Sequence, residues 1–233
     1  GGQRELMGSD VVAFETNENY SYVSGDATKA YAPEKCRLAL RQIIFLNPDY
    51  FVIFDRVTST RPEYRKTWLL HTATEPRIEG AVFTASQERG RLYSKTLLPE
   101  RFVMVKIGGP EKQFWVDGQN FPMPKGHATP DTTQLLGQWR IEVSPEKIAA
   151  DDYFLHFIQA GDIGLPAMDK SELVRKGKRV GVRITGKSRV WEALFDTEGS
   201  AGGHISIREG AKIITDREFA RNVQPQKGLF GTE

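Results

Sequence analysis

The sequence RQIIFLNPDYFVIFDRV, residues 41–57, contains the clearest structural pattern in this chain. Two runs rich in Ile, Phe and Val, residues 41–46 and 50–57, flank the turn sequence Asn47-Pro48-Asp49, where proline presets the backbone and aspartate can bond its own backbone. These runs predict two consecutive antiparallel strands. Residues 51–54 are apolar at both parities, so this strand should be covered on both faces and lie at the centre of a sandwich.

Short strands are predicted along the rest of the chain as well. Apolar residues recur in short runs separated by turn residues, and no long stretch has a helical period. The pattern predicts an all-β chain, a large antiparallel β-sandwich (supersandwich-like) of many short strands. The further strands are expected at residues 64–72, 81–85, 91–98, 103–107, 139–143, 153–159, 179–185, 190–196, 204–208 and 212–215.

The length of 233 residues fits one large β domain or two small domains. Residues 117–138 contain three prolines and three glycines without apolar periodicity, which predicts a long surface loop and a possible internal boundary. Strands of the same style continue on both sides of this loop. We therefore expect one β-sandwich domain over residues 1–221, followed by a frayed C-terminal tail over residues 222–233.

Composition argues against several functional classes. The 32 basic and 30 acidic residues are mixed along the chain and give a formal charge of +2, unlike the positive field of a nucleic-acid-binding protein. No apolar run approaches the ~20 residues that a membrane-spanning helix needs. Cys36 is the single cysteine, which excludes an intrachain disulfide and a cysteine-based metal site. Residues 1–5 lack the pattern of a signal peptide, so we expect any export signal to have been removed or to lie upstream.

The four histidines do not form a short metal-binding motif. His127 in the long loop and His204 at a strand start are expected at the surface. His156 shares one face of its strand with Phe154 and Ile158, which predicts a hydrogen-bonded histidine in the core. No residue is therefore assigned to metal binding, and no cofactor is expected in this chain.

His71 ends the run Trp68-Leu69-Leu70-His71, near the point where a strand meets a loop. An imidazole with a pKa near neutrality could act there as an acid, a base or a ligand. A purely structural role is the alternative, and both interpretations stay open at this point.

The segment YSYVSGDATKAY, residues 20–31, combines Asp26 with Tyr20, Tyr22 and Tyr31 around a glycine turn. Tyrosine rings stack on sugars while their hydroxyl groups form hydrogen bonds, so this segment could face a glycan. The alternative is a turn that is held by the Asp26 side chain and packed by aromatic edges.

A basic stretch over residues 175–189 could attract an acidic polysaccharide through its carboxylate or sulfate groups. The alternative is a solvated hairpin whose basic side chains protect a sheet edge from aggregation. No phosphate-binding glycine motif and no serine-hydrolase elbow occurs in the sequence. The basic residues are Arg175, Lys176, Lys178, Arg179, Arg183, Lys187 and Arg189.

The first hundred residues resemble the C-terminal half of heparinase II/III-like polysaccharide lyases. The resemblance rests on the order and spacing of five sequence blocks, and the later strands are compatible with it without being distinctive. The blocks are Tyr22 to Tyr31 (YVSGDATKAY), Arg41 to Leu46 (RQIIFL), Asp49 to Val57 (DYFVIFDRV), Lys66 to His71 (KTWLLH) and Leu97-Leu98-Pro99.

This resemblance implies that an N-terminal αα-toroid packs against the β-sandwich and that a uronate-containing glycan is cleaved between them by β-elimination. In that mechanism a Tyr or His base on the toroid removes the C5 proton, while Asn, Arg or His groups neutralise the uronate carboxylate. Family members also often carry a zinc site built from an H-x-H pair, an Asp and the His of a His-Asn dipeptide. The toroid sequence, the H-x-H pair and the His-Asn dipeptide do not occur in this chain.

No catalytic residue and no metal ligand is therefore carried over from the family. The resemblance favours a structural role, through turn and inter-strand polar contacts, for Asp26, Tyr31, Arg41, Asp55, Arg56 and His71. The candidate substrate-binding residues are Tyr22, Asp26, Tyr31, Arg41 and His71.

Three functions remain open. The chain could be a lyase module that is inactive alone and supports a catalytic toroid, a separate module that binds acidic glycans, or a structural sandwich with an exposed apolar patch for a partner. The expected partners are an acidic polysaccharide and the toroid of the parent protein, with no nucleic acid and no membrane span. The resemblance also implies a periplasmic or extracellular location.

Overall fold

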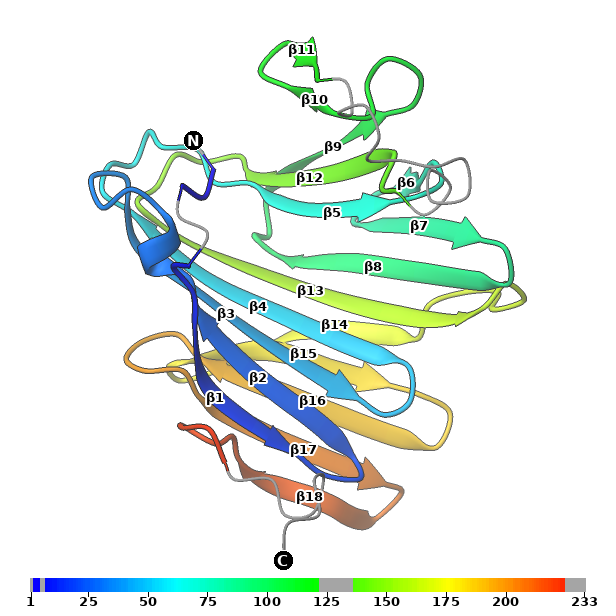
Figure 1. Cartoon of the computed structure of the whole chain (residues 1–233). Coiled ribbons are helices and arrows are strands. Elements are labelled where there is room, and N and C mark those ends of the chain that lie inside the picture. The colour runs from blue at the N-terminus through cyan, green and yellow to red at the C-terminus, as the bar shows by residue number, and fades with distance from the viewer. Residues whose placement is uncertain (1, 5–6, 122–135, 225–233) are drawn as a thin grey trace, which may run out of the picture.

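The computed structural model describes residues 2–4, 7–121 and 136–224 of the chain. Within these residues the chain is almost entirely β, with one short 3-10 helix, η1 (Thr28–Ala30). The predicted antiparallel β-sandwich is confirmed, and a large sheet carries a smaller sheet on each face (Figure 1). In the part of the chain that is described, no helix is long and apolar enough to cross a membrane.

The largest sheet has eight strands in the order β1-β2-β3-β4-β13-β8-β7-β6. Its centre is the β4–β13 pair, which is antiparallel. The segment 41–57 forms the second half of β3, the turn at residues 47–49 and most of β4, with Leu46 opposite Tyr50. The eight strands are β1 (Asp10–Thr16), β2 (Tyr20–Asp26), β3 (Cys36–Leu46), β4 (Tyr50–Ser59), β6 (Arg77–Glu79), β7 (Val82–Gln87), β8 (Gly90–Leu98) and β13 (Asp151–Asp162).

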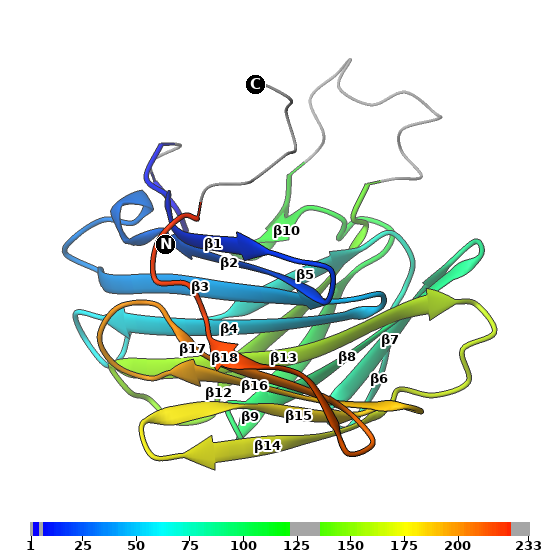
Figure 2. The ribbon, with the colours of Figure 1, turned by 90° about the horizontal axis from the view of Figure 1, so that it is seen from below.

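A second sheet has five strands in the order β14-β15-β16-β17-β18 and packs on one face of the large sheet (Figures 1 and 2). Fully buried side chains from the two sheets form the main core, among them Phe54 of β4 and Phe195 of β16. These two rings stack with their centroids 5.1 Å apart. The five strands are β14 (Lys170–Lys176), β15 (Arg179–Thr185), β16 (Arg189–Asp196), β17 (Gly203–Glu209) and β18 (Lys212–Glu218).

A three-stranded sheet in the order β5-β12-β9 packs on the opposite face of the large sheet. Its Trp68 and Ile141 form a second core with Phe154 of β13, which alternates along the strand with Leu155 of the main core. A small hairpin, β10–β11, follows β9 in the chain (Figure 1). These strands are β5 (Trp68–Thr72), β9 (Phe102–Gly108), β10 (Trp115–Val116), β11 (Gln119–Asn120) and β12 (Trp139–Pro145).

Strand β4 is covered on both faces, as its apolar pattern predicted. Val52 and Phe54 lie in the main core, whereas Ile53 and Val57 pack against the second core. Only Phe51, next to the turn, is 36% exposed. A strand that is buried on both faces has a continuous apolar sequence. Strand β4 has such a sequence because a sheet packs on each of its faces.

Some strand boundaries differ from those expected. The third strand starts at Trp68 and not at residue 64, because residues 60–67 carry the chain from the large sheet to the three-stranded sheet. Lys66 fixes this crossing, since its Nζ lies 3.0 Å from Asp152 Oδ2 and donates to the Ala149 carbonyl at 2.6 Å. The apolar pattern did not identify β1 and β14, both edge strands with mostly exposed or half-buried side chains.

Strands on both sides of residues 117–138 belong to the same sheets. Strand β12 pairs with β5 and β9, and β13 pairs with β4 and β8. The segment predicted as a tail begins with paired residues, because Phe14 N donates to the Asn222 carbonyl (3.2 Å) and Gln224 N donates to the Phe14 carbonyl (2.9 Å). Residues 122–135, with His127, and residues 225–233 lie outside the described part.

His156 lies in the second core, as predicted from its strand parity. It has no exposed surface, and its ring stacks on Trp68 with the centroids 3.7 Å apart. Its Nδ1 lies 3.3 Å from Thr96 Oγ1, but Nε2 has no hydrogen-bond partner among the described residues, so only one ring nitrogen is bonded. Burial, and secondarily the charge of Arg41, lowers the pKa of His156 from 6.5 to about 3.

We expect His156 to make the fold sensitive to acid. The unfolded chain binds this proton near pH 6.5 and the folded chain only near pH 3, so stability is complete above pH 6.5 and is lost as the pH falls toward 3. Between pH 7 and pH 5 the free energy of unfolding of the native chain should fall by about 2 kcal/mol more than that of His156→Leu. Urea unfolding at both pH values measures this difference. Equal losses in the native chain and in His156→Leu would contradict the prediction.

Candidate functional site

A pocket of about 480 Å³ lies where the outer face of the three-stranded sheet meets the region of the β10–β11 hairpin. We call it the His71 pocket. The sheet contributes His71 from β5 and Arg140 from β12, and the segment around the hairpin contributes an apolar wall. The lining residues are His71, Gln113, Phe114, Val116, Phe121, Gly137 and Arg140.

His71 faces outward on β5, because Trp68 and Leu70 on the alternate positions pack in the second core. A Cβ at Gly137 would lie 2.7 Å from the His71 Cβ, so the backbone at residue 137 approaches this side chain as only glycine allows. Partial burial, and then the positive charge of Arg140, lowers the pKa of His71, while Glu142 opposes the shift. His71 is therefore a neutral imidazole at neutral pH, which can both donate and accept a hydrogen bond.

Arg140 lies directly opposite His71 in the register between β12 and β5. Its Nε donates to Glu142 Oε1 at 2.9 Å, and its Nη2 donates to the Trp115 carbonyl at 2.9 Å. These two contacts fix the plane of the guanidinium and tie the sheet to β10. The contacts of Arg140 with described residues involve Nε and Nη2, and none of them involves Nη1.

The apolar wall of the pocket comes from the segment that contains the hairpin. Phe114 N donates to Asn120 Oδ1 at 2.8 Å, and Phe121 N donates to the Phe114 carbonyl at 3.1 Å, so the segment is closed on itself. Val116 and Phe121 are each about half exposed. Aromatic faces beside a guanidinium suit a sugar ring that carries a carboxylate or a sulfate group.

The structure places the other candidate residues on the large sheet. Arg41 binds Asp55 with both ends of its fork, from Nε to Oδ1 at 2.7 Å and from Nη2 to Oδ2 at 2.8 Å. Burial raises the pKa of the Asp55 carboxyl, while the Arg41 contact opposes that rise. Burial also raises the pKa of Tyr31, whose hydroxyl is close enough to interact with the charges of Arg41 and Asp55. Tyr31 and Arg41 therefore form one partly exposed cluster.

Tyr22 lies entirely inside the main core and presents no surface to a ligand. Its ring stacks on Phe219 with the centroids 4.4 Å apart, and its hydroxyl donates to Gln42 Oε1 at 2.6 Å. The same oxygen accepts a hydrogen bond from Gly202 N at 2.9 Å, so Gln42 links the large sheet to the loop before β17. The sequence favoured a glycan contact for Tyr22 from the chemistry of its ring, and residues 20–26 were not predicted as a strand, so the inward position of Tyr22 on β2 was missed.

Asp26 forms the local turn that was the alternative interpretation of this segment. Its Oδ1 accepts a hydrogen bond from Thr28 N at 2.9 Å, at the start of η1. Thr28 Oγ1 in turn accepts from Ala39 N at 3.0 Å and joins this turn to β3. Asp26 thus orders the chain that leads to Tyr31.

The polar contacts expected by resemblance are present at Arg56 as well. This buried side chain reaches the loop after β16, where Nη2 donates to the Gly199 carbonyl at 2.6 Å and Nη1 to the Asp196 carbonyl at 3.2 Å. Sequence reasoning missed Arg140, which lies in the strand predicted at residues 139–143. Its outward position on that strand was the available signal, but its proximity to His71 depends on the pairing of β12 with β5.

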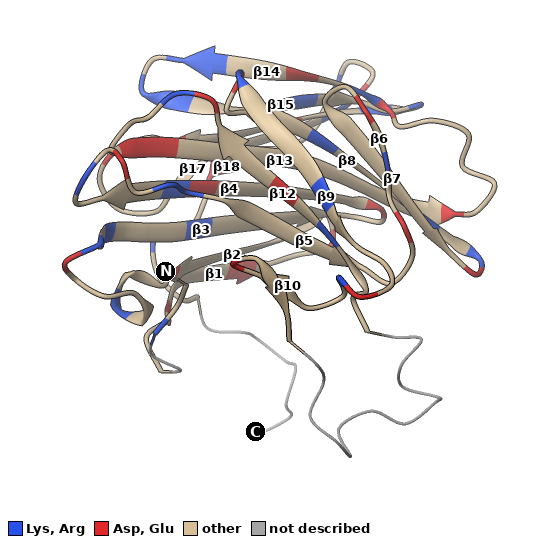
Figure 3. Cartoon of the chain, turned by 90° about the horizontal axis from the view of Figure 1, so that it is seen from above, with Lys and Arg blue, Asp and Glu red and all other residues tan. Residues whose placement is uncertain are grey.

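No group of three or more His, Cys, Asp or Glu residues in the described part could hold a metal ion. His204 is partly exposed, and its Nε2 lies 3.1 Å from Asp216 Oδ1 on the five-stranded sheet. The basic stretch forms the β14–β15 hairpin and continues to the start of β16 (Figure 3). Each of its basic residues except Lys187 makes an ion pair with a described acidic residue.

We predict that Arg41→Ala destabilises the fold by about 2–3 kcal/mol, because it leaves the buried Asp55 carboxylate without its partner. Chemical denaturation measures the change. The control is Lys29→Ala, which removes the exposed pair between Lys29 and Asp10 and should change stability little. Similar small effects from both substitutions would show that the Arg41 pair contributes no more than a surface pair.

We predict that Arg140→Gln raises the pKa of His71, since it removes the nearby positive charge that disfavours the imidazolium. An NMR titration of the His71 ring protons reads this shift directly. Glu142→Gln should move the His71 pKa in the opposite direction, because Glu142 favours the charged form. The same His71 pKa in both variants would show that the charges of Arg140 and Glu142 do not affect His71.

No protein-family model matches the sequence, and a search of curated proteins finds no match. Solved structures share the fold. The heparan sulfate lyase HepC from Pedobacter heparinus is 17% identical at a TM-score of 0.53, and the match covers 82% of this chain and 28% of the lyase. A mutant of that lyase is 12% identical at a TM-score of 0.54, with 92% and 28% covered. A heparinase III with methylated lysines is 14% identical at a TM-score of 0.54, with 91% and 27% covered.

This chain therefore spans less than a third of the length of the lyases that it matches. The matched part contains the layered arrangement of antiparallel sheets described above. The fold of this chain is that of the C-terminal β-sandwich module of heparan sulfate lyases.

Proposed function

We propose that this chain is the β-sandwich module of a heparinase II/III-like polysaccharide lyase, which cleaves uronate-containing glycans by β-elimination. The observation that carries the proposal is a fold likeness over 91–92% of this chain that uses only 27–28% of two of the lyases. On this proposal an αα-toroid in the rest of the parent protein supplies the base that removes the C5 proton. The isolated chain contributes to glycan binding and supports the toroid, but it does not cleave the glycan.

The His71 pocket is the part of this chain that we assign to the glycan. Arg140 Nη1 would donate to a carboxylate or sulfate oxygen, as charge-assisted hydrogen bonds to such groups are strong. The neutral His71 would bond a sugar hydroxyl, and Phe121 would contact the apolar face of the ring. Asp26, Tyr31 and Arg41 remain candidates for contact on the large sheet.

The toroid would pack over the outer face of the three-stranded sheet. Leu69 of β5 and Val103 of β9 alternate with residues of the second core and are each 46% exposed on this face. Val116 and Phe121 extend the apolar surface at the His71 pocket. Exposed apolar residues that gather on one face are typical of a surface that a partner covers.

A second candidate function is a separate module that binds acidic glycans. The His71 pocket favours it, because the guanidinium, the imidazole and the aromatic wall all belong to this chain. Titration of the isolated chain with heparin and alginate oligomers distinguishes the two functions. A separate binding module should bind them tightly through the His71 pocket, so that Arg140→Gln removes this binding, whereas a lyase module needs the toroid to complete the cleft at this pocket.

We further propose that the chain itself holds no cofactor and that the parent protein is exported to the periplasm or the outside. The basis for export is the nature of the substrate, since polysaccharides of this kind are found outside the cytoplasm. Fractionation of cells that express the parent protein tests the location. Recovery in the cytoplasmic fraction alone would contradict it.

The lyase proposal is tested with the parent protein expressed from its whole reading frame. We expect several hundred helical residues before this module and the release of unsaturated uronate, read by ultraviolet absorbance, from the whole protein but not from the isolated chain. In the whole protein, Arg140→Gln should lower kcat/KM by about tenfold, as expected for loss of a charged hydrogen bond. Arg77→Gln, at an exposed position on β6, is the matched control. A reading frame without a helical domain, or product release by the isolated chain, would overturn the proposal.

A further inference from the structure

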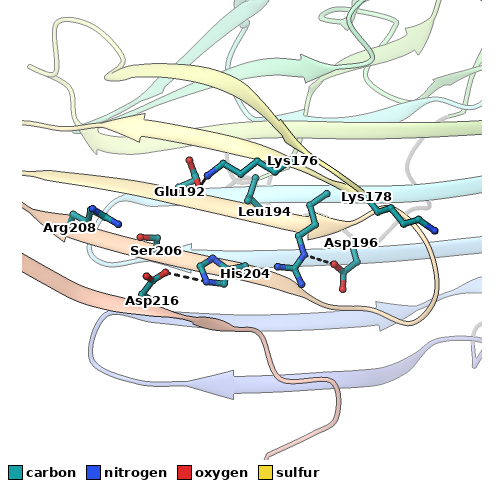
Figure 4. A pocket seen from close by; sticks show the side chains of 10 residues that line it. Lys176, Lys178, Glu192, Leu194, Asp196, His204, Ser206, Arg208 and Asp216 are labelled. Atoms are coloured by element: carbon teal, nitrogen blue, oxygen red, sulfur yellow. Dashed lines mark hydrogen bonds and ion pairs between the residues drawn. The ribbon is translucent and has the colours of Figure 1, made fainter.

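The outer face of the five-stranded sheet carries a second hollow, a groove of about 700 Å³ (Figure 4). It lies on the far side of the molecule from the His71 pocket, because the five-stranded and three-stranded sheets cover opposite faces of the large sheet (Figure 1). Leu194 and Ser206 line it together with charged side chains of β14, β15, β16, β17 and β18. We call it the outer groove.

Two carboxylates in the outer groove are each shared by two cations. Glu192 accepts from Lys176 Nζ at 2.6 Å through Oε1 and from Arg183 Nη2 at 2.7 Å through Oε2. The Glu192 side chain is 11% exposed, whereas those of Lys176 and Arg183 are 54% and 44% exposed. Burial alone would raise the pKa of Glu192, but the hydrogen bonds from these two cations lower it. The surface that solvent meets at this point is therefore cationic.

Asp196 repeats the arrangement at the other end of the groove. Its Oδ1 accepts from Arg179 Nε at 2.8 Å and its Oδ2 accepts from Arg221 Nη2 at 2.8 Å. The further pairs Arg179–Glu218 and His204–Asp216 neutralise part of this charge. Asp196, 16% exposed, is the inner partner of Arg179 and Arg221, which are 28% and 51% exposed. Glu218 and Asp216, at 52% and 42%, are instead more exposed than Arg179 and His204.

Arg208 is the cation of the groove that has no acidic partner. Its side chain is exposed on β17, two residues from Ser206 on the same face, and it makes no ion pair or hydrogen bond with any residue in the described ranges. Figure 4 shows Arg208 beside Ser206, with Glu192 and Lys176 on β16 and β14 of the same sheet. A free guanidinium next to a free hydroxyl is a suitable pair of donors for a sulfate or a carboxylate.

We propose that the outer groove is a second binding surface for acidic glycans, in which Arg208, Ser206 and Lys176 bind sulfate or carboxylate groups. The inference rests on the proposed lyase function for its choice of ligand, and it adds a surface that the cleavage site does not include. Because the groove and the His71 pocket face in opposite directions, one short oligosaccharide cannot fill both. The groove would instead hold a distant part of the same polymer, or a second polymer, and raise the effective concentration of substrate.

The test is titration of the isolated chain with heparin oligosaccharides, with alginate oligomers of equal length and with neutral dextran, followed by calorimetry at low salt. Arg208→Gln combined with Lys176→Gln should weaken heparin binding by about tenfold or more, which corresponds to about 1.4 kcal/mol. Arg77→Gln makes a matched charge change on β6 and should leave binding unchanged. Thermal unfolding checks that the double variant is folded, and added salt should weaken binding by the native chain.

The arms of this experiment separate the possible outcomes. Binding of heparin but not alginate assigns sulfate as the ligand group, and binding of both assigns any acidic group. Affinity that is unchanged in the double variant but lost in Arg140→Gln places the only binding site in the His71 pocket and overturns the outer groove. Absence of binding at millimolar ligand also overturns it. Neither result affects the lyase proposal, which is judged by product release from the whole protein.

Discussion

The structure depends on one constraint: the central strands of the large sheet are buried on both faces. Strands β4 and β13 contribute Phe54, Leu155 and Phe157 to the main core and Phe154 and His156 to the second core. Burial of apolar surface is the dominant favourable term in folding, and here the same backbone supplies two such surfaces. The His71 pocket and the outer groove lie on the outer faces of the two sheets that pack against the large sheet.

Polar contacts specify how those layers meet. Gln42 accepts hydrogen bonds from Tyr22 and from the backbone of Gly202, and the buried Arg56 reaches the carbonyl groups of the loop after β16. Buried polar groups require partners, so a displaced layer would leave these donors and acceptors unbonded. The contact with Gln42 explains why Tyr22, a candidate for binding, serves the interior.

Much of the fold could be predicted from sequence because alternation and turn residues are local signals. The β3–β4 hairpin and the two-faced burial of β4 followed from residues 41–57 alone. The candidate site was less accessible, since Arg140 meets His71 only through the pairing of two strands about seventy residues apart. Tyr22 shows the same limit: residues 20–26 were not predicted as a strand, and Tyr22 is buried because the five-stranded sheet, far along the chain, packs on its face of β2.

Sharing of β4 and β13 between two cores has a thermodynamic consequence. The second core cannot open without exposing one face of strands whose other face supports the main core, so the layers have little freedom to melt separately. The whole sandwich should behave as a single cooperative unit in which a defect in either core lowers the stability of both. Loops at the rims are then the parts of the molecule that can vary without disturbing that unit.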